Sequence, residues 1–314
     1  MSHQAPDRFG DQKARETTGI AYGVGAYLIW GLFPLFWPLV RSAGAAEILA
    51  HRVIWSLVVA SVLLALTARR GWWNRLRTRR NLILLATAAA VIAVNWGIYI
   101  WAVNHGHVVE AALGYYINPI LSILFGVGLL RERLAGMQWV SVGLAAVAVV
   151  VLTLEYGTPP WIALALAISF ATYGLIKNRL GAGAVETLTV ESAMLAPLAI
   201  GYLIFLETTG GLTFVHLGWA HSLLLVAAGP ITAVPLLLFA AAATRIPLST
   251  LGLLQYLTPT GQFLLGVLYF GETMSAGRWV GFTLVWLALM ILTWYGIGQA
   301  RRHRTTRELV LEQV

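Results

Sequence analysis

The sequence has no cysteine and few charged residues. Asp, Glu, Lys and Arg make up 11% of its 314 residues, whereas an average soluble domain has about 25%. The lack of cysteine excludes disulfides, thiolate metal sites and cysteine nucleophiles. The scarcity of charge argues against a soluble enzyme or a nucleic-acid-binding domain, despite a formal net charge of +8. With 59% hydrophobic residues, the chain is predicted to be an integral membrane protein.

Motifs for ATP hydrolysis and for catalysis are also missing. There is no GxxxxGK(S/T) phosphate loop, so the chain is not expected to hydrolyse ATP. There is no HExxH or GxSxG motif, which argues against an intramembrane protease or hydrolase. His105 and His107 form an HxH pair, but no third metal ligand has suitable spacing. We therefore expect no catalytic residue, no metal and no cofactor.

Long apolar runs fill the chain instead. A membrane-spanning helix needs about 20 apolar residues, because the hydrocarbon core is about 30 Å thick and each residue rises about 1.5 Å. The runs do not alternate with period two, which excludes barrel strands. The sequence predicts an all-α membrane protein with ten transmembrane helices, near residues 19–40, 46–67, 81–103, 108–130, 136–155, 159–177, 186–206, 219–243, 248–270 and 276–297.

The basic residues gather on one side of this predicted topology. When the loops are assigned alternately to two sides, 18 of the 21 Lys and Arg residues fall on the side that holds both termini. Basic loops stay in the cytoplasm, so both termini are predicted to be cytoplasmic in a bacterial-type inner membrane. The basic loop after the second helix is expected to bind anionic lipid headgroups and not nucleic acid. Its basic residues are Arg69, Arg70, Arg75, Arg77, Arg79 and Arg80.

The second half of the chain repeats the first at an offset of 140 residues. Residues 116–153 align without gaps to 256–293, and Tyr, Pro, Glu and Trp recur in register. The offset spans five helices, an odd number, so the halves are predicted to enter the membrane from opposite sides. We therefore predict two inverted five-helix repeats, 19–155 and 159–297, between tails at 1–18 and 298–314. Many secondary transporters have this design, with the substrate site near the midplane at the repeat interface.

Charged residues lie inside the predicted second helix, in the run AEILAHRVIWS. Glu47 and His51 share a face at i, i+4; Arg52 follows, and Trp55 lies three residues further on. Ionisable groups at membrane depth mark a pathway or a buried pair. Two interpretations stay open: a substrate or proton site, and an ion pair of Glu47 with His51 or Arg52 that anchors the helix end.

The predicted third helix carries polar and aromatic residues in the run NWGIYIWAVN. Asn95 and Tyr99 share one face, Trp96 lies beside them and Asn104 ends the run. Such a face is typical of a cavity wall for a flat or cationic organic solute. A hydrogen bond from Asn95 to a neighbouring helix is the alternative interpretation.

The fourth and ninth predicted helices each contain a proline beside a polar residue. Pro119 follows Asn118 and Pro259 follows Thr258, and a proline inside a helix frees a carbonyl and produces a kink. Matching kinks in two repeats point to a transport site, so these helices are expected to face each other across a cavity. A packing kink without a transport role is the alternative. The pathway candidates on these helices are Glu110, Tyr115, Tyr116, Asn118, Gln255, Tyr256 and Thr258.

Ionisable side chains at depth are candidates for proton coupling. Glu191, in the predicted seventh helix, aligns with Arg52 when Glu47 is set against Glu186. It is therefore either a coupling carboxylate or the partner of Arg52. The candidates for proton coupling are Glu47, His51, Glu110 and Glu191.

Three segments closely resemble the RarD proteins of the EamA branch of the drug/metabolite transporter superfamily: EILAHRVIWS, NWGIYIWAVNHGHVVEAALGYYINP and AAATRIPLSTLGLLQYLTPT. The resemblance covers about residues 19–297. It implies ten helices in an inverted repeat and a cavity lined mainly by helices 1–4 and 6–9. The fifth and tenth helices would be peripheral and a candidate homodimer contact. RarD proteins are described as chloramphenicol-sensitivity or resistance permeases, and wider relatives export amino acids and other small metabolites.

Together, the residues and the resemblance predict a secondary transporter, and not an enzyme. It would export small amphipathic metabolites or drugs by alternating access, with export resting on the resemblance alone. An intramembrane lipid-modifying enzyme and a channel-like pore are the alternatives. The expected partners are a small-molecule substrate, the lipid bilayer and a second copy of the chain.

Overall fold

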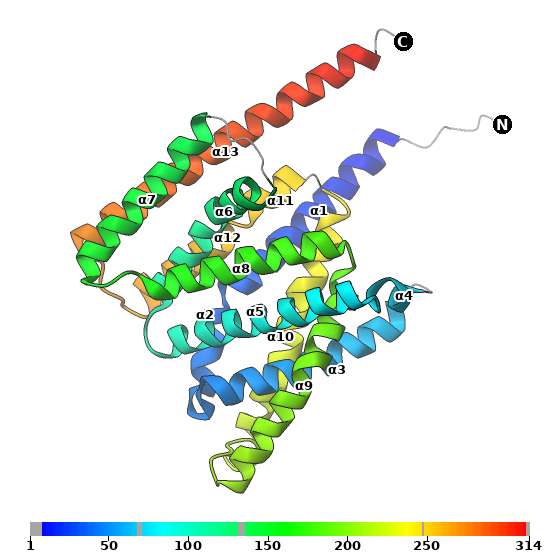
Figure 1. The fold of residues 1–314 in the computed structure, drawn as a ribbon, viewed down its shortest axis with the longest axis vertical. Coiled ribbons are helices and arrows are strands. Elements are labelled where there is room, and N and C mark those ends of the chain that lie inside the picture. The colour runs from blue at the N-terminus through cyan, green and yellow to red at the C-terminus, as the bar shows by residue number, and fades with distance from the viewer. Residues whose placement is uncertain (1–7, 68–70, 131–135, 247, 312–314) are drawn as a thin grey trace, which may run out of the picture.

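The structure is a computed structural model that describes the backbone of residues 8–67, 71–130, 136–246 and 248–311. Every regular element within these ranges is a helix (Figure 1), so the predicted all-α fold is confirmed for this part of the chain. Arg69 and Arg70, which belong to the predicted headgroup-binding loop, lie outside the described residues.

The first half of the described chain has long helices separated by short ones. The long helices are α1 (Arg8–Gly31), α3 (Gly44–Thr67), α5 (Arg79–Asn104), α6 (Val108–Leu130) and α7 (Gly136–Tyr156). The short ones are α2 (Phe33–Phe36), the 3-10 helix η1 (Trp37–Ala43) and α4 (Trp72–Leu76). Pro34 and Pro38 stand in the first turns of α2 and η1, where a proline needs no backbone N–H. The first predicted helix, 19–40, therefore divides after Gly31.

The helix that contains Pro259 in the second half is divided, unlike the helix that contains Pro119 in the first half. The long helices of the second half are α8 (Trp161–Leu180), α9 (Ala184–Thr208), α10 (Trp219–Ala243) and α13 (Ala276–Leu311). The predicted ninth helix divides into α11 (Leu248–Leu254), α12 (Leu257–Leu264) and the π-helix η2 (Leu265–Tyr269). The break after α11 lies four residues before Pro259, where the proline ring meets the carbonyl of the preceding turn. In contrast, α6 continues through Pro119.

Eight helical stretches of the described chain are long and apolar enough to cross a membrane. The first combines α2, η1 and α3, and the others lie in α5, α6, α7, α8, α9, α10 and α13. The remaining two predicted spans correspond to α1 and to the divided segment α11–α12–η2.

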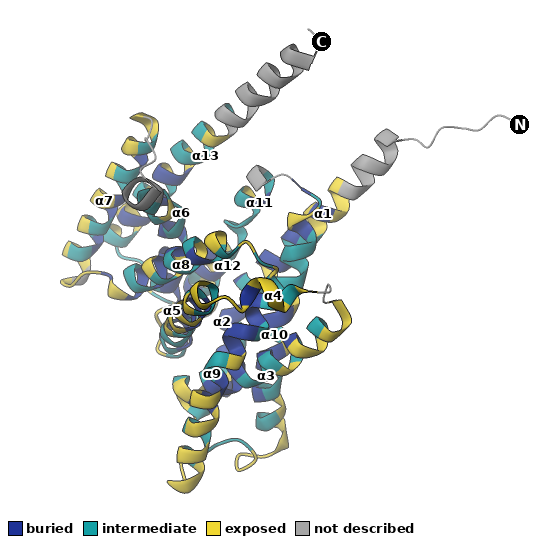
Figure 2. Ribbon diagram, turned by 45° about the vertical axis from the view of Figure 1, so that its right-hand side comes forward, coloured by how far each residue is buried: buried dark blue, intermediate teal, exposed yellow. Residues whose placement is uncertain are grey.

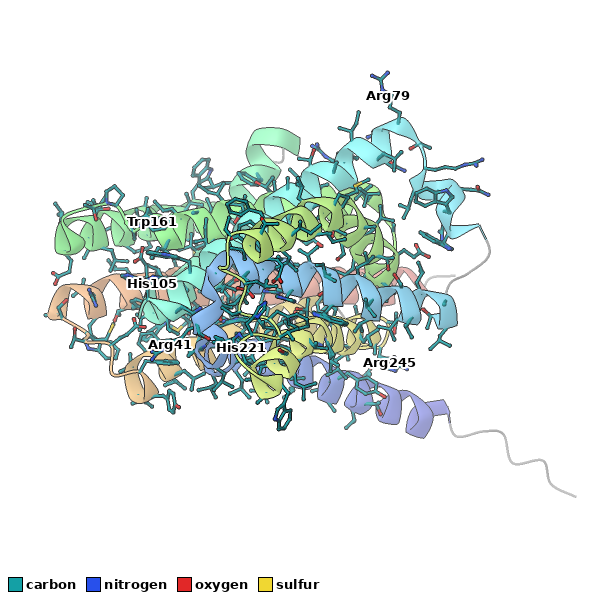
Figure 3. All side chains as sticks on the ribbon, turned by 90° about the horizontal axis from the view of Figure 1, so that it is seen from below. Arg41, Arg79, His105, Trp161, His221 and Arg245 are labelled. Carbon is teal, nitrogen blue, oxygen red and sulfur yellow. The ribbon has the colours of Figure 1, made fainter. Side chains whose placement is uncertain are left out.

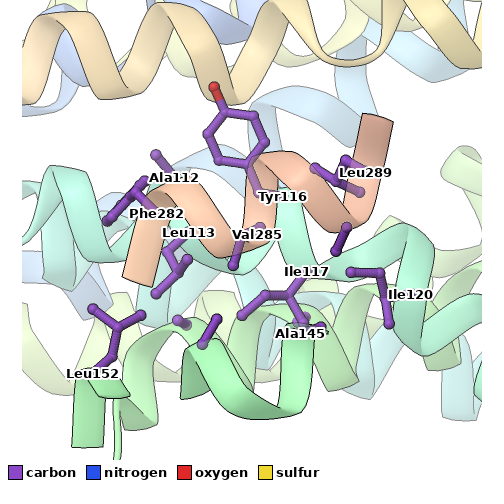
Figure 4. Close-up of a cluster of buried hydrophobic side chains, with 14 of the residues drawn as sticks. Ala112, Leu113, Tyr116, Ile117, Ile120, Ala145, Leu152, Phe282, Val285 and Leu289 are labelled. Atoms are coloured by element: carbon purple, nitrogen blue, oxygen red, sulfur yellow. The ribbon is translucent and has the colours of Figure 1, made fainter. Parts of the chain in front are cut away.

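Helices from the two halves pack on one another through the whole molecule. Helix α3 packs against α9 and α10, α6 packs against α8 and α12, and α7 packs against α13 (Figure 1). A buried apolar cluster joins α6, α7 and α13 through Leu113, Ala145, Phe282 and Val285 (Figure 4). This burial holds the fifth and tenth predicted helices against each other within one chain.

Glycines permit the closest helix contacts. A Cβ atom at Gly229 of α10 would lie 2.5 Å from the backbone of Trp55 on α3. A Cβ atom at Gly281 of α13 would lie 2.5 Å from the side chain of Leu152 on α7. A larger residue at Gly229 would push α10 and α3 apart, because the neighbouring atoms are backbone, whereas at Gly281 the side chain of Leu152 would have to shift.

The outer faces of the helices are apolar. Leu154, Leu198 and Trp294 are 78%, 74% and 81% exposed, and Figure 2 shows exposed residues along the outer helices. So much exposed apolar surface suits contact with lipid and not with water. Figure 3 shows Arg79 and Arg245 towards one end of the molecule and His105 and Trp161 towards the other.

Candidate functional site

Arg52 lies in the protein interior with its guanidinium group against aromatic rings. Its Cζ atom is 3.9 Å from the ring centroid of Trp96 on α5, 5.2 Å from that of Trp37 on η1 and 5.7 Å from that of Phe33 on α2. Arg52 is 4% exposed. The prolines that shape α2 and η1 thereby help to build an aromatic wall for a cation on α3. We call Arg52 and these three aromatic residues the Arg52 cluster.

Two tyrosines and an asparagine extend the Arg52 cluster along α5 and α6. The rings of Tyr99 and Tyr115 are 5.7 Å apart, and both tyrosines pack in the same buried cluster as Phe33 and Trp37. The Tyr115 hydroxyl donates a hydrogen bond to Oδ1 of Asn95 at 3.4 Å, and Nδ2 of Asn95 donates to the hydroxyl of Ser169 on α8 at 2.9 Å. The hydroxyl of Tyr99 is buried and has no hydrogen-bond partner among the described residues.

Glu47 binds a loop and does not pair with Arg52. Its carboxylate accepts hydrogen bonds from the backbone N–H of Thr213 at 3.0 and 3.2 Å, from the Thr213 hydroxyl at 2.9 Å and from the N–H of Phe214 at 3.0 Å. Nε2 of His51 is 3.9 Å from the same carboxylate, and neither ring nitrogen of His51 has a hydrogen-bond partner among the residues described. Glu47 therefore anchors the 209–218 loop, between α9 and α10, to α3.

Three other predicted residues lie in different surroundings. Oε1 of Glu110 accepts a hydrogen bond of 3.1 Å from the N–H of Ile162, so this carboxylate caps the first turn of α8. Asn104, at the end of α5, has both amide atoms buried, and Nε1 of Trp55 on α3 is also buried. None of these atoms has a hydrogen-bond partner within the part of the chain that the structure describes.

The two helices that contain Pro119 and Pro259 contact each other directly. The hydroxyls of Tyr116 on α6 and Thr260 on α12 are 2.8 Å apart. Oδ1 of Asn118 is buried, and no residue that the structure describes is its hydrogen-bond partner. Tyr116 thus lies at a direct contact between α6 and α12, whereas Glu110 and Tyr115 contact other elements.

The residues around the helix break also bind neighbouring helices. Thr258 donates a hydrogen bond of 2.9 Å to the carbonyl of Tyr27 on α1. Tyr256 bonds to Thr293 on α13, and Gln255 stands at the break itself. These contacts hold the divided segment between α1 and α13.

Glu191 pairs with Lys177 and not with Arg52. Oε1 of Glu191 is 2.9 Å from Nζ of Lys177, and Oε2 accepts a hydrogen bond of 3.0 Å from the hydroxyl of Tyr173. Lys177 also bonds to Thr187. The pairing of Glu191 with Arg52, one of the two interpretations of Glu191, is wrong. The Glu191 carboxylate is instead paired with Lys177, a basic residue on α8.

Sequence reasoning missed several members of these groups. Phe33 and Trp37 fall in the segment FPLFWP, whose prolines and aromatics were a usable signal. Lys177 is the last residue of the predicted helix 159–177 and lies in the last turn of α8, but its pairing with Glu191 was not predicted. Thr213 carries no signal, because its role depends on where the 209–218 loop folds.

Similarity to known proteins shows the family of this chain. The EamA-like transporter family profile matches residues 17–154. Protein RarD of Streptomyces exfoliatus is 57% identical over 294 residues, which cover 93% of each chain. The chain belongs to the RarD family of EamA-like transporters. Another relative, the Bacillus subtilis (strain 168) protein named uncharacterized transporter YojE, is 41% identical and covers 94% of this chain and 99% of its own.

The fold agrees with this membership. A solved structure titled "Crystal structure of protein" superposes with a TM-score of 0.56 at 19% identity, covering 87% of this chain and 96% of that one. This RarD-family chain therefore shares its fold with a much more distant sequence. Together with the apolar helices, family membership identifies a multi-pass membrane transporter.

Proposed function

We propose that this RarD-family protein is a secondary transporter that exports small amphipathic metabolites or drugs by alternating access. One observation carries the proposal: buried polar groups without partners gather with aromatic rings in the interior. Among the residues that the structure describes, they are Nε and Nη1 of Arg52 and the Tyr99 hydroxyl, which lie beside the rings of Trp96 and Tyr115. A buried polar group without a partner is costly, so such a concentration marks a place where a ligand supplies the missing contacts.

The packing of the helices supports an inverted repeat of five plus five helices. In this scheme the first repeat holds α1, α3, α5, α6 and α7, and the second holds α8, α9, α10, α11–α12 and α13. Exchanging equivalent helices converts the α6–α8 contact into the α12–α1 contact and the α1–α10 contact into the α8–α5 contact, and all four contacts occur. Two halves that pack in this exchangeable way suit a rocking transporter better than a fixed pore.

The surroundings of the transporter complete the proposal. We place both termini in the cytoplasm, because the basic loops share their side. The arginines of the 69–80 loop would bind anionic headgroups. The exposed outer faces of α7 and α13, with Val150 and Met290, would form the contact of a homodimer.

Flux through proteoliposomes tests transport. Purified protein would be reconstituted, and counterflow of amino acids, phenicols and aromatic amines measured with and without a pH gradient, against protein-free vesicles. Saturable counterflow of a subset of solutes is expected. Covalent turnover of lipid without flux of any solute would instead establish the enzyme, and flux that never saturates would establish the pore.

Two substitutions test the pathway between α6 and α12. Asn118→Ala and Gln255→Ala are expected to reduce transport of the identified substrate. Gly201→Ala is the matched control, because a Cβ atom at Gly201 of α9 meets nothing within 4 Å. Unchanged transport in both test variants would show that the pathway runs elsewhere.

Proton coupling is proposed through Glu47, His51, Glu110 or Glu191. Glu110→Gln keeps an oxygen that accepts the Ile162 N–H but cannot lose a proton. If Glu110 carries the proton, the variant transports without pH dependence. Full pH dependence in the variant excludes Glu110.

A further inference from the structure

Arg52 is a buried cation without an anion. No carboxylate lies within ion-pair distance of its guanidinium group among the residues that the structure describes. The nearest carboxylate along α3, that of Glu47, is occupied by the amides and hydroxyl of the 209–218 loop. Glu191, at the position aligned with Arg52 in the second half, is occupied by Lys177.

Aromatic rings compensate this buried charge only in part. A desolvated cation–π contact offsets only part of the free energy that an unpaired buried charge costs. The Cζ atom of Arg52 lies 3.9 Å from the ring centroid of Trp96, and this contact supplies no hydrogen-bond acceptor. Among the residues that the structure describes, none accepts a hydrogen bond from Nε or Nη1 of Arg52, and both atoms are buried. A charged N–H donor without an acceptor matches a carboxylate oxygen, which forms a charge-assisted hydrogen bond with it.

The walls around these donors indicate the rest of the ligand. Trp37, Trp96 and Phe33 present rings, and the phenols of Tyr99 and Tyr115 lie on the α5–α6 side. The unpaired Tyr99 hydroxyl adds one more donor. A cationic solute does not suit this site, because the protein's own cation already lies against the rings.

We propose that Arg52 binds the carboxylate of an amphipathic organic acid whose aromatic or apolar body packs on the rings of the Arg52 cluster. This rests on the proposed transport function, and it names the class of substrate. The site is closed in this structure, with Arg52 4% and Tyr99 2% exposed, so the acid enters when the flanking helices part. Alternating access provides that opening.

Matched acid and amide probes test the proposal by binding to the full-length protein in nanodiscs. The probes are indole-3-acetate with indole-3-acetamide and 3-phenylpropionate with 3-phenylpropionamide, at pH 7.5 and constant ionic strength, measured by calorimetry. We expect the wild-type protein to bind at least one acid tenfold or more tightly than its amide, and Arg52→Gln to lose this preference. Arg41→Gln is the control, since Arg41 is an exposed arginine outside the cluster.

Several results would overturn the assignment. Equal affinity for acid and amide in the wild type, or no binding of any acid, would do so. So would an acid preference that persists in Arg52→Gln, or stabilisation by chloride alone with no difference between the probes. If Arg52→Gln does not fold, Arg52→Lys is measured. It keeps the charge but loses the planar guanidinium donors, so its acid preference should fall at least threefold, and an unchanged preference would show that these donors do not hold the carboxylate.

Measuring both acid binding and solute flux distinguishes a failure of the Arg52 assignment from a failure of the proposed transport function. If acids bind through Arg52 but no solute crosses the membrane, transport fails and the Arg52 assignment stands. If acids and amides are transported alike by the wild type and by Arg52→Gln, transport stands and the assignment fails.

Discussion

The carboxylate of Glu272 caps the backbone of Val108, 164 residues away in the sequence. Its Oε1 atom is 2.5 Å from the N atom of Val108, and Oε2 is 3.1 Å from that of Val109. The loop that leads into α13 thereby satisfies the free amides at the start of α6. One side chain of the second half thus fixes the end of a helix of the first half.

Removing this cap should destabilise the protein. Glu272→Ala leaves two amides of α6 without an acceptor, and the loss of a helix cap costs about 1 kcal/mol. We expect a lower midpoint of thermal unfolding in detergent. Glu272→Gln keeps an acceptor oxygen, and its midpoint should lie between those of the wild type and the alanine variant. A midpoint of Glu272→Ala equal to the wild type would show that the cap contributes nothing.

The same carboxyl should make stability depend on pH. Burial raises the pKa of Glu272 above its ordinary value of 4.5, more strongly than the amides of Val109 and Val108 lower it. A raised pKa in the folded state means that this group's stabilising contribution is present below its unfolded pKa and is lost as the pH rises through the folded pKa. The midpoint of the wild-type protein, relative to that of Glu272→Gln, should therefore fall as the pH rises above 4.5. A constant difference would refute the raised pKa.

The buried pair of Lys177 and Glu191 should show strong coupling. Glu191 is 2% exposed and Lys177 is 21% exposed, and breaking one partner of a buried pair costs about 3 kcal/mol. Lys177→Met and Glu191→Leu should each destabilise by about this amount, whereas the double variant should cost less than their sum. A double-mutant cycle from thermal unfolding measures the difference. Additive losses would mean that the two side chains do not stabilise each other.

The contact of α10 with α3 should not tolerate a methyl group. Gly229→Ala would place Cβ 2.5 Å from the backbone of Trp55, so we expect a loss of about 1–3 kcal/mol from overpacking. Gly201→Ala, where the added atom meets nothing within 4 Å, should be neutral or gain up to about 1 kcal/mol from helix propensity. Equal stabilities of the two variants would contradict the close approach.

The sequence was sufficient to predict where the helices lie along the chain. It was insufficient to predict which side chains contact one another between helices. Runs of apolar residues are local, so their lengths identified the stretches that now form α3, α5 and α10 closely. Pro259 is also local, and the helix divides one turn before it. The prolines of FPLFWP carried the same kind of signal, but the apolar length of 19–40 concealed it.

Contacts between distant segments could not be predicted in the same way. An ion pair of Glu47 with His51 or Arg52 was one interpretation of their spacing along one helix. In the folded chain the Glu47 carboxylate lies 3.9 Å from Nε2 of His51 and accepts a hydrogen bond from Thr213, which the spacing did not predict. Glu191 meets Lys177 because α8 packs beside α9 at that level. The donor that binds a buried carboxylate is determined by the rotation of the helices and by the path of the loops. Hydrophobic periodicity predicts neither of these.

Four hydrogen bonds from Thr213 and Phe214 to Glu47 have a mechanical consequence. A loop held by one side chain through two backbone amides and a hydroxyl cannot slide independently of the helix that carries that side chain. Whenever α3 tilts, the 209–218 loop must tilt with it. Arg52 lies on the same helix and therefore moves together with the loop. A spin label on exposed Val215 would therefore report the motion of the buried cation from outside the helix bundle.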